Sequence, residues 1–142
     1  MSKLNSNTPC PCQSSSDDPI SYIVCCGRYH KGKINAPTAE ALMRSRYTAY
    51  AIGNAQYLYR TWHEKTRPSL QSLRDSGPQD LISLKILSTQ EGGPNDQKGM
   101  VEFVSSYNND DVNADPEEQV IQHKENSLFV RVKNKWVYID AV

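Results

Sequence analysis

The sequence has no long apolar run, no export leader and no excess of either charge. No stretch approaches the roughly 20 apolar residues that a membrane helix needs, and residues 1–11 lack the apolar middle of a signal peptide. The chain has 16 lysines and arginines against 16 aspartates and glutamates, which gives no overall attraction to nucleic acid. We therefore expect a soluble cytoplasmic protein without membrane contact or specific DNA binding, and 142 residues suit one main domain.

Cysteine is absent from most of the chain, because all four cysteines lie between positions 10 and 26. They are Cys10, Cys12, Cys25 and Cys26. Disulfides do not persist in a reducing cytoplasm, so the cluster predicts a metal site. Four thiolates suit tetrahedral Zn²⁺, and a site closed by four protein ligands is structural rather than catalytic. His30 either replaces one sulfur as a ligand or lies at the surface, and we expect it at the surface.

The polar residues 13–19 between the cysteines have turn chemistry and no apolar periodicity. Such a segment cannot bury enough surface to order itself. Structural zinc contributes about 10–16 kcal/mol of apparent folding free energy in small peptides. We therefore expect the metal to serve as the core of this segment, with one zinc ion per chain.

The cysteine arrangement resembles the SEC-C motif, a zinc-binding module also found at the end of the SecA translocation motor. The resemblance continues through the segments APTAEALMRSRYTAY (36–50), AQYLYRTWH (55–63), GMVEFV (99–104), ENSLFV (125–130) and WVYID (136–140). In order and spacing these segments resemble the YchJ family, which is functionally uncharacterised. Gln13-Ser14 stands where the family usually has Gly-Ser, and the chain ends without the second SEC-C copy that many members carry, so it resembles a short form.

The resemblance implies two parts. Residues 1–35 would form the SEC-C zinc-binding motif. Residues 36–142 would form an α+β domain similar to nuclear transport factor two, a cone in which N-terminal helices pack on a curved antiparallel sheet.

Residue patterns independently predict helices followed by strands. Pro37 and Thr38 are helix-start residues, Gly53 is a stop signal, and Asn54 can cap a second helix. A third helix is expected over residues 69–76. Alternation from residue 81, and in segments 100–107, 119–132 and 136–140, predicts antiparallel strands, with a turn at Asn134-Lys135. This element order is typical of an α+β fold.

The first helix would bury an arginine. Arg46 falls in the middle of an apolar stripe that includes Leu42 and Tyr47, and a buried guanidinium needs a carboxylate or carbonyl partner. One interpretation is a pocket inside the cone. Its lining would be Arg46, Tyr47, Trp62, His63, Glu125, Trp136 and Tyr138, with Asp140 on the same strand face as the last two. The other interpretation, which we favour from the residues alone, is a packed core in which Arg46 pairs with Glu102, Glu125 or Asp140.

Two classes of function remain open. The first is a protein-interaction or adaptor module, because in SecA the motif's role is contact with a chaperone and with ribosomes, and Arg28, His30, Lys31 and Lys33 could form a basic contact patch. The second is a small-molecule-binding protein or an isomerase- or dehydratase-like enzyme, with His63 or Asp140 as base and Tyr47 or Tyr138 as hydrogen-bond donor. No motif assigns these catalytic roles, so we expect no enzyme. A homodimer is a third expectation.

Overall fold

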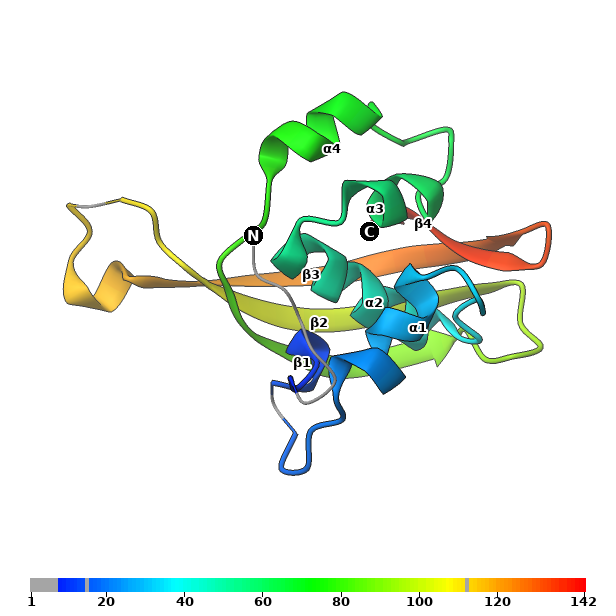
Figure 1. The fold of residues 1–142 in the computed structure, drawn as a ribbon, viewed down its shortest axis with the longest axis horizontal. Coiled ribbons are helices and arrows are strands. Elements are labelled where there is room, and N and C mark those ends of the chain that lie inside the picture. The colour runs from blue at the N-terminus through cyan, green and yellow to red at the C-terminus, as the bar shows by residue number, and fades with distance from the viewer. Residues whose placement is uncertain (1–7, 15, 112) are drawn as a thin grey trace.

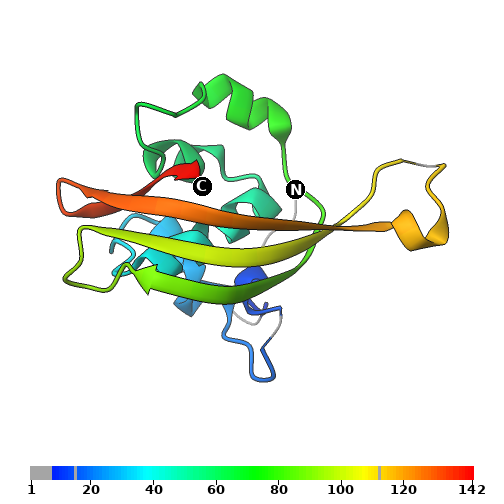
Figure 2. The same cartoon turned by 180° about the vertical axis from the view of Figure 1, so that it is seen from behind.

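The computed structural model describes residues 8–14, 16–111 and 113–142. Helices cover one face of a four-stranded antiparallel sheet, whose strand order is β1-β2-β3-β4. Figure 1 shows the helices in front of the sheet, and Figure 2 shows the opposite sheet face without a helix across it. This arrangement confirms the predicted α+β fold. Among the described residues, no helix combines the length and apolar character that crossing a bilayer requires.

The helices and strands follow the predicted order. The short 3₁₀ turns are η1 (Pro11–Gln13), η2 (Tyr22–Val24) and η3 (Pro116–Glu118). The helices are α1 (Cys26–His30), α2 (Ala39–Ile52), α3 (Ala55–Arg60) and α4 (Leu70–Ser76). The strands are β1 (Leu81–Glu91), β2 (Lys98–Asn108), β3 (Val120–Val132) and β4 (Lys135–Ala141).

Local capping chemistry sets the ends of the central helix. The Thr38 hydroxyl accepts a hydrogen bond from the Ala41 backbone N–H at 3.0 Å, which satisfies one of the unpaired donors of the first turn of α2. Gly53 ends α2 in the left-handed conformation, with φ of 77°. The Asn54 side chain then caps α3 by accepting from the Tyr57 N–H at 3.1 Å. The three predicted cap residues are confirmed.

The β3–β4 turn lies one residue earlier than predicted. Lys133 and Asn134, rather than Asn134 and Lys135, have positive φ values of 52° and 67°. Two consecutive left-handed residues match the right-handed twist of a tight hairpin, and asparagine tolerates this conformation well. Lys135 is instead the first residue of β4.

The core lies between α2 and the sheet. Its most buried large side chains include Leu42 from α2, Leu84 from β1, Val101 from β2 and Phe129 from β3. The cysteine segment packs against the other side of α2, so this helix is buried along almost its whole length. Consequently α2 is shared between the cysteine segment and the cone interior.

Candidate functional site

The four cysteine sulfurs converge. All four Sγ atoms lie within 4.8 Å of one another, and the Cys12 Sγ atom is 3.5 Å from that of Cys26 and 3.6 Å from that of Cys25. The cysteines are free thiols, and these distances greatly exceed the roughly 2.05 Å of a disulfide. Tetrahedral zinc, with Zn–S distances of about 2.3 Å, would hold its sulfurs about 3.8 Å apart. The donor set and its spacing therefore fit one metal ion.

Backbone pairing brings the two cysteine pairs together. The Cys10 N–H donates to the Ile20 carbonyl at 2.8 Å, and the Tyr22 N–H donates to the Thr8 carbonyl at 2.9 Å. Cys26 begins helix α1, and a side chain at Gly27 would come within 2.8 Å of the Tyr22 carbonyl oxygen. We call residues 8–14 and 16–30 the knuckle. Held by these bonds, its sulfurs would bind a metal with no coordination position left for a substrate.

The thiols also influence one another electrostatically. Hydrogen bonds from Cys12 and Cys25 hold the pKa of Cys10 well below its usual range, which favours its thiolate form. Gln13 contributes a further donor, because its Nε2 atom lies 3.6 Å from the Cys12 sulfur and 3.7 Å from the Cys25 sulfur. The residue that departs from the usual Gly-Ser pattern therefore lies against the sulfur cluster.

The knuckle is bound tightly to the cone. The Cys10 Sγ atom lies 3.5 Å from Thr48 Oγ1, and Arg44 donates to the Cys12 carbonyl at 2.8 Å. The Ser14 hydroxyl accepts from the Leu84 N–H of β1 at 3.1 Å. These contacts attach the knuckle to both α2 and the sheet.

His30 is not at the surface, contrary to our expectation, and it is not part of the sulfur cluster. Its ring is half-buried, with Nε2 2.8 Å from the Ser45 carbonyl oxygen and Nδ1 2.7 Å from the Tyr22 hydroxyl. Burial lowers the pKa of His30, so the neutral ring donates from Nε2 to Ser45 and accepts from Tyr22. No local pattern in the sequence indicates that this histidine joins the knuckle to α2.

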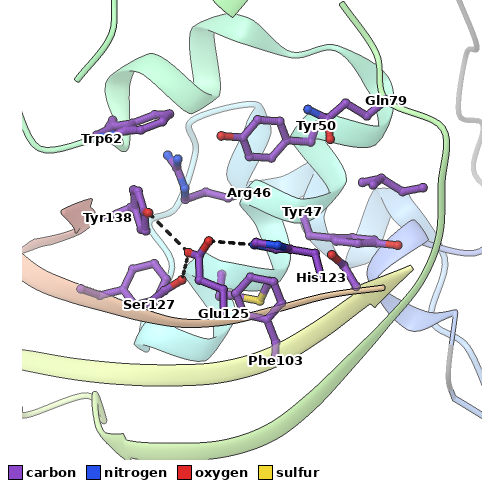
Figure 3. A pocket seen from close by; sticks show the side chains of 14 residues that line it. Arg46, Tyr47, Tyr50, Trp62, Gln79, Phe103, His123, Glu125, Ser127 and Tyr138 are labelled. Carbon is purple, nitrogen blue, oxygen red and sulfur yellow. Dashed lines mark hydrogen bonds and ion pairs between the residues drawn. The ribbon is translucent and has the colours of Figure 1, made fainter. Parts of the chain in front are cut away.

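A half-open cavity of about 260 Å³ lies between α2 and the sheet (Figure 3). Helix α2 lines it with residues at helical spacing, Met43, Arg46, Tyr47 and Tyr50. Strand β3 lines it with alternate residues, His123, Glu125, Ser127 and Phe129. Positions three or four apart share one helix face and positions two apart share one strand face, so these two sets face each other across the cavity.

Arg46 is the buried cation of the cavity, with only 5% of its surface exposed. Its Nη1 atom donates to the Leu58 carbonyl at 3.0 Å and to the Thr61 hydroxyl at 2.9 Å. Its Cζ atom lies 4.8 Å from the ring centroids of both Trp62 and Tyr138. Burial lowers the pKa of Arg46, but a guanidinium with an ordinary pKa above 12 stays charged at neutral pH.

Among the described residues, no carboxylate neutralises this charge. Within the described ranges, none of the ion pairs includes Arg46, which contradicts the predicted pairing with Glu102, Glu125 or Asp140. Glu102 instead contacts Lys124 at 3.7 Å, and Asp140 is exposed. The carbonyl, the hydroxyl and the two aromatic faces solvate the guanidinium in place of a counter-ion.

Glu125 is the acidic group of the cavity. Its carboxylate accepts from the Ser127 hydroxyl at 2.5 Å and from the Tyr138 hydroxyl at 3.4 Å, and it lies 3.2 Å from His123 Nε2. Its side chain is 21% exposed, so part of the carboxylate remains open to the cavity. Burial and then the Glu125 charge raise the pKa of Tyr138, which keeps this phenol protonated as a donor.

The structure brings together some of the predicted pocket residues and separates others. Arg46, Tyr47, Trp62, Glu125 and Tyr138 line the cavity. His63, Trp136 and Asp140 do not, and of the candidate catalytic residues only Tyr47 and Tyr138 face the cavity.

Each predicted pocket residue that lies outside the cavity has a hydrogen-bond partner of its own. His63 Nδ1 accepts from the Lys65 N–H at 3.1 Å. Trp136 donates from Nε1 to the Pro37 carbonyl at 3.1 Å. Asp140 follows an irregularity in the β3–β4 pairing, and its carboxylate accepts from the Ala141 N–H at 2.9 Å. Strand alternation predicts Trp136 and Asp140 on the same face as Tyr138, and it does not reveal the irregularity that precedes Asp140.

Residue spacing could have revealed the cavity residues that we missed. Tyr50 is four positions after Arg46 on α2, and His123 and Ser127 flank Glu125 at two positions on β3. Backbone pairing then positions the aromatic wall, because His63 N–H donates to the Tyr138 carbonyl at 2.7 Å and Tyr138 N–H donates to the Thr61 carbonyl at 2.8 Å. This pairing places Trp62 edge-on to the ring of Tyr138.

A four-cysteine knuckle packed on a helix-covered cone defines a class of SEC-C-motif proteins with a nuclear transport factor two-like domain. Residues 38–141 match the family model described as "YchJ, middle NTF2-like domain". The chain belongs to the YchJ family.

Relatives cover nearly the whole chain. A UPF0225 protein of Streptomyces coelicolor is 45% identical over 94% of this chain and 94% of its own length, and one of Deinococcus radiodurans is 38% identical over 94% and 88%. Two solved structures are similar, both of SEC-C motif-containing proteins. The solution structure from Rhodopseudomonas palustris has a TM-score of 0.75, 27% identity and coverage of 95% and 98%. The crystal structure from Psychrobacter arcticus has a TM-score of 0.79, 26% identity and coverage of 95% and 82%.

Proposed function

We propose that the protein binds a small molecule in the cone cavity, and that zinc in the knuckle stabilises the helix that forms one wall of this cavity. The observation that carries the proposal is the charged, buried Arg46 beside a half-open cavity, with no carboxylate partner among the described residues. A buried charge without a counter-ion is costly. Natural pockets combine apolar walls with a few convergent polar groups, as Arg46 and Glu125 do here.

The packed-core interpretation fits the structure less well. The aromatic residues line the cavity without filling it, since Trp62 and Tyr138 leave about 260 Å³ between helix and sheet. The four free thiols suit a reducing compartment, so we place this function in the cytoplasm. There the knuckle would carry Zn²⁺ as a structural ion.

Fragment screening by NMR of the zinc-loaded protein tests the binding function. We expect fragments to shift the resonances of α2 and β3 residues that face the cavity. The control is a Ser105→Leu variant, because Ser105 is a buried cavity residue whose enlargement would narrow the space. Binding that is lost in this variant supports the proposal. A broad fragment library that gives no saturable shifts at the cavity would contradict it.

The adaptor role is a second candidate, favoured by exposed apolar residues on the knuckle. Ile20 and Val24 are 47% and 58% exposed, close in sequence to Arg28. An apolar spot beside a basic group suits an anionic partner surface. We propose contact with the ribosome or an export chaperone, the partners that the SEC-C motif implies.

Co-sedimentation with purified ribosomes and titration with the purified chaperone, both at rising salt, test this role. Val24→Asp should abolish binding, whereas Val120→Asp, at a residue 50% exposed at the start of β3, should leave binding unchanged. Equal binding by both variants would contradict the adaptor role. The predicted homodimer is tested by sedimentation velocity of the same samples.

A further inference from the structure

We propose that a cleft separate from the cone cavity, between the knuckle, α3 and the β3–β4 hairpin, binds the phosphate group of a small phosphate monoester. The cleft has a volume of about 270 Å³ and shares no lining residue with the cone cavity. This second site goes beyond the binding function proposed above, because its walls come from other segments of the chain and its charge selects another kind of ligand.

The cleft is lined by cations that have no counter-ion. Arg60 of α3 and Lys133 and Lys135 of the hairpin line it, and all three side chains are exposed. Among the described residues, no aspartate or glutamate lines the cleft, and none of the three cations takes part in an ion pair. An anion that enters the cleft would therefore meet positive charge that no neighbouring carboxylate neutralises.

Two basic segments that are far apart in the sequence meet at this cleft. Residues 28–35 and residues 131–135 each contain three lysines and arginines and no acidic residue, and both segments contribute to the lining. The turn of the first segment lies against α3, because a Cβ atom at Gly32 would be 3.9 Å from Arg60 Nη2. The fold thus adds the charge of α3 to that of the two segments.

The acidic residues nearest the tip of the longest loop lie far from the cleft. Asp115, Glu117 and Glu118 belong to or flank η3. Figure 1 shows η3 and the β3–β4 hairpin at opposite ends of the long axis of the molecule. The net charge of zero is therefore unevenly distributed, and the end of the molecule that holds the cleft is basic.

Hydrogen bonds hold the walls of the cleft in place. Arg60 Nη2 donates to the Tyr29 carbonyl at 2.9 Å and to the His30 carbonyl at 3.2 Å, which joins α3 to the knuckle. Trp136 Nε1 donates to the Pro37 carbonyl at 3.1 Å, which joins the hairpin to the segment before α2. Because the hydrogen bonds of Arg60 to described residues use Nη2, its Nε and Nη1 donors remain available to a ligand.

The charge of the cleft favours a phosphate monoester over other anions. A phosphate monoester carries about −1.5 to −2 charges at pH 7 and has three strong acceptor oxygens. Three lining cations match this charge better than they match the single charge of a carboxylate or of a phosphodiester in a nucleic-acid backbone. Arg60 can donate to the phosphate from α3, and Lys133 and Lys135 can donate to it from the hairpin.

The rest of the lining suits an apolar group attached to the phosphate. The buried side chains of Leu42, Trp136 and Val137 line the cleft, together with the exposed side chains of Ile34 and Val132. Its volume of about 270 Å³ is close to the lower end of the roughly 300–1,000 Å³ of ligand pockets. A phosphate joined to one small apolar group therefore fits better than phosphate alone.

NMR titration of the zinc-loaded wild-type protein with matched probes tests this site. The probes are phenyl phosphate, phenyl sulfate and inorganic phosphate. We expect phenyl phosphate to bind most tightly and to shift the amide signals of residues 31–36 and 132–137 to saturation. Phenyl sulfate has a similar shape and a single charge, so it should bind about two- to fivefold more weakly, the effect of one exposed charge interaction. Inorganic phosphate should also bind more weakly, because it lacks the apolar ring.

Two charge reversals assign the binding to the cleft. Lys135→Glu should weaken the binding of phenyl phosphate by about fivefold or more, because it replaces attraction with repulsion. Lys85→Glu is the matched control, because Lys85 is an exposed residue of β1 outside the cleft lining. It changes the net charge by the same amount and should leave the affinity unchanged.

Four outcomes would overturn the proposal. Absence of saturable shifts at the cleft would remove the site, and equal weakening by both variants would show attraction to the net charge of the protein alone. Equal affinity for phenyl phosphate and phenyl sulfate would overturn the selection of a dianion. Tighter binding at the same residues by a single-stranded RNA without a terminal phosphate would show a nucleic-acid surface in place of a monoester site.

Discussion

The sulfur of Cys10 lies 3.5 Å from the hydroxyl oxygen of Thr48, so a predicted metal ligand contacts the central helix of the cone directly. Arg46 and Tyr47, two residues of the cavity wall, immediately precede Thr48 on α2. The metal site and the cavity thus lie on different sides of one helix. Order in the knuckle should therefore affect order in the cavity.

The first prediction concerns the metal itself. Protein purified under reducing conditions should contain one zinc ion per chain by elemental analysis. Cys26→Ser should lower the zinc affinity by more than about tenfold, because a hydroxyl is a poor substitute for a thiolate ligand. Ser72→Ala, at a position in α4, serves as the control and should retain the metal. Wild-type protein that contains no zinc would contradict the prediction.

The second prediction concerns the effect of metal removal on α2. Chelation should raise amide hydrogen exchange in the knuckle and in α2, because the contacts of Cys10 with Thr48 and of Arg44 with Cys12 depend on an ordered knuckle. Exchange in the β3–β4 hairpin, which lies away from the sulfurs, provides the internal reference. Unchanged exchange in α2 after complete zinc loss would show that the cone does not depend on the metal.

The third prediction uses two glycines. A Cβ atom at Gly27 would lie 2.8 Å from the Tyr22 carbonyl oxygen, a backbone atom that cannot move freely. Gly27→Ala should therefore destabilise the knuckle by about 1–3 kcal/mol, the usual cost of overpacking. At Gly93 the nearest atom would be a side-chain oxygen of Asp96 at 3.4 Å, so Gly93→Ala should have little effect. Thermal unfolding that ranks the two variants the other way would refute this account of the knuckle.

The sequence predicted features that depend on local chemistry. The caps at Thr38, Gly53 and Asn54 need only neighbouring backbone groups, and a four-cysteine cluster within 17 positions implied convergence whatever the path of the chain. Helical spacing was enough to place Arg46 inside the fold.

Features that depend on distant pairing could not be predicted in this way. An irregularity in the pairing of β3 with β4 separates Asp140 from the cavity. His30 bonds to Ser45 on another helix, a contact that no local pattern announces. The prediction of a carboxylate partner for Arg46 is wrong. Arg46 instead contacts a backbone carbonyl and two aromatic rings.

The fourth prediction concerns pH. Burial lowers the pKa of His30 below the ordinary value of about 6.5. At a pH between the His30 pKa of the folded chain and that of the unfolded chain, the unfolded chain binds the proton and the folded chain does not. The free energy of unfolding therefore falls as the pH falls below about 6.5. The contribution of His30 to the free energy of unfolding is fully present above about pH 6.5. It is lost as the pH falls towards the His30 pKa of the folded chain.

Denaturant unfolding at pH 7.5 and 5.5 measures this contribution. His30→Gln keeps all four sulfurs, so it controls for acid release of the metal. Wild-type protein should lose more stability than His30→Gln over this interval. An equal loss, or an NMR titration that places the His30 pKa above 6.5, would contradict the buried, neutral ring.

The most direct test of the central claim is the NMR signal of the Arg46 side-chain Nε–H group during titration with the fragments that bind the protein. If the cavity is a binding site beside Arg46, this signal shifts progressively to saturation, and the same fragments move it much less in the Ser105→Leu variant. An Arg46 signal that stays unchanged while fragments bind elsewhere on the protein would show that the buried guanidinium serves the fold alone.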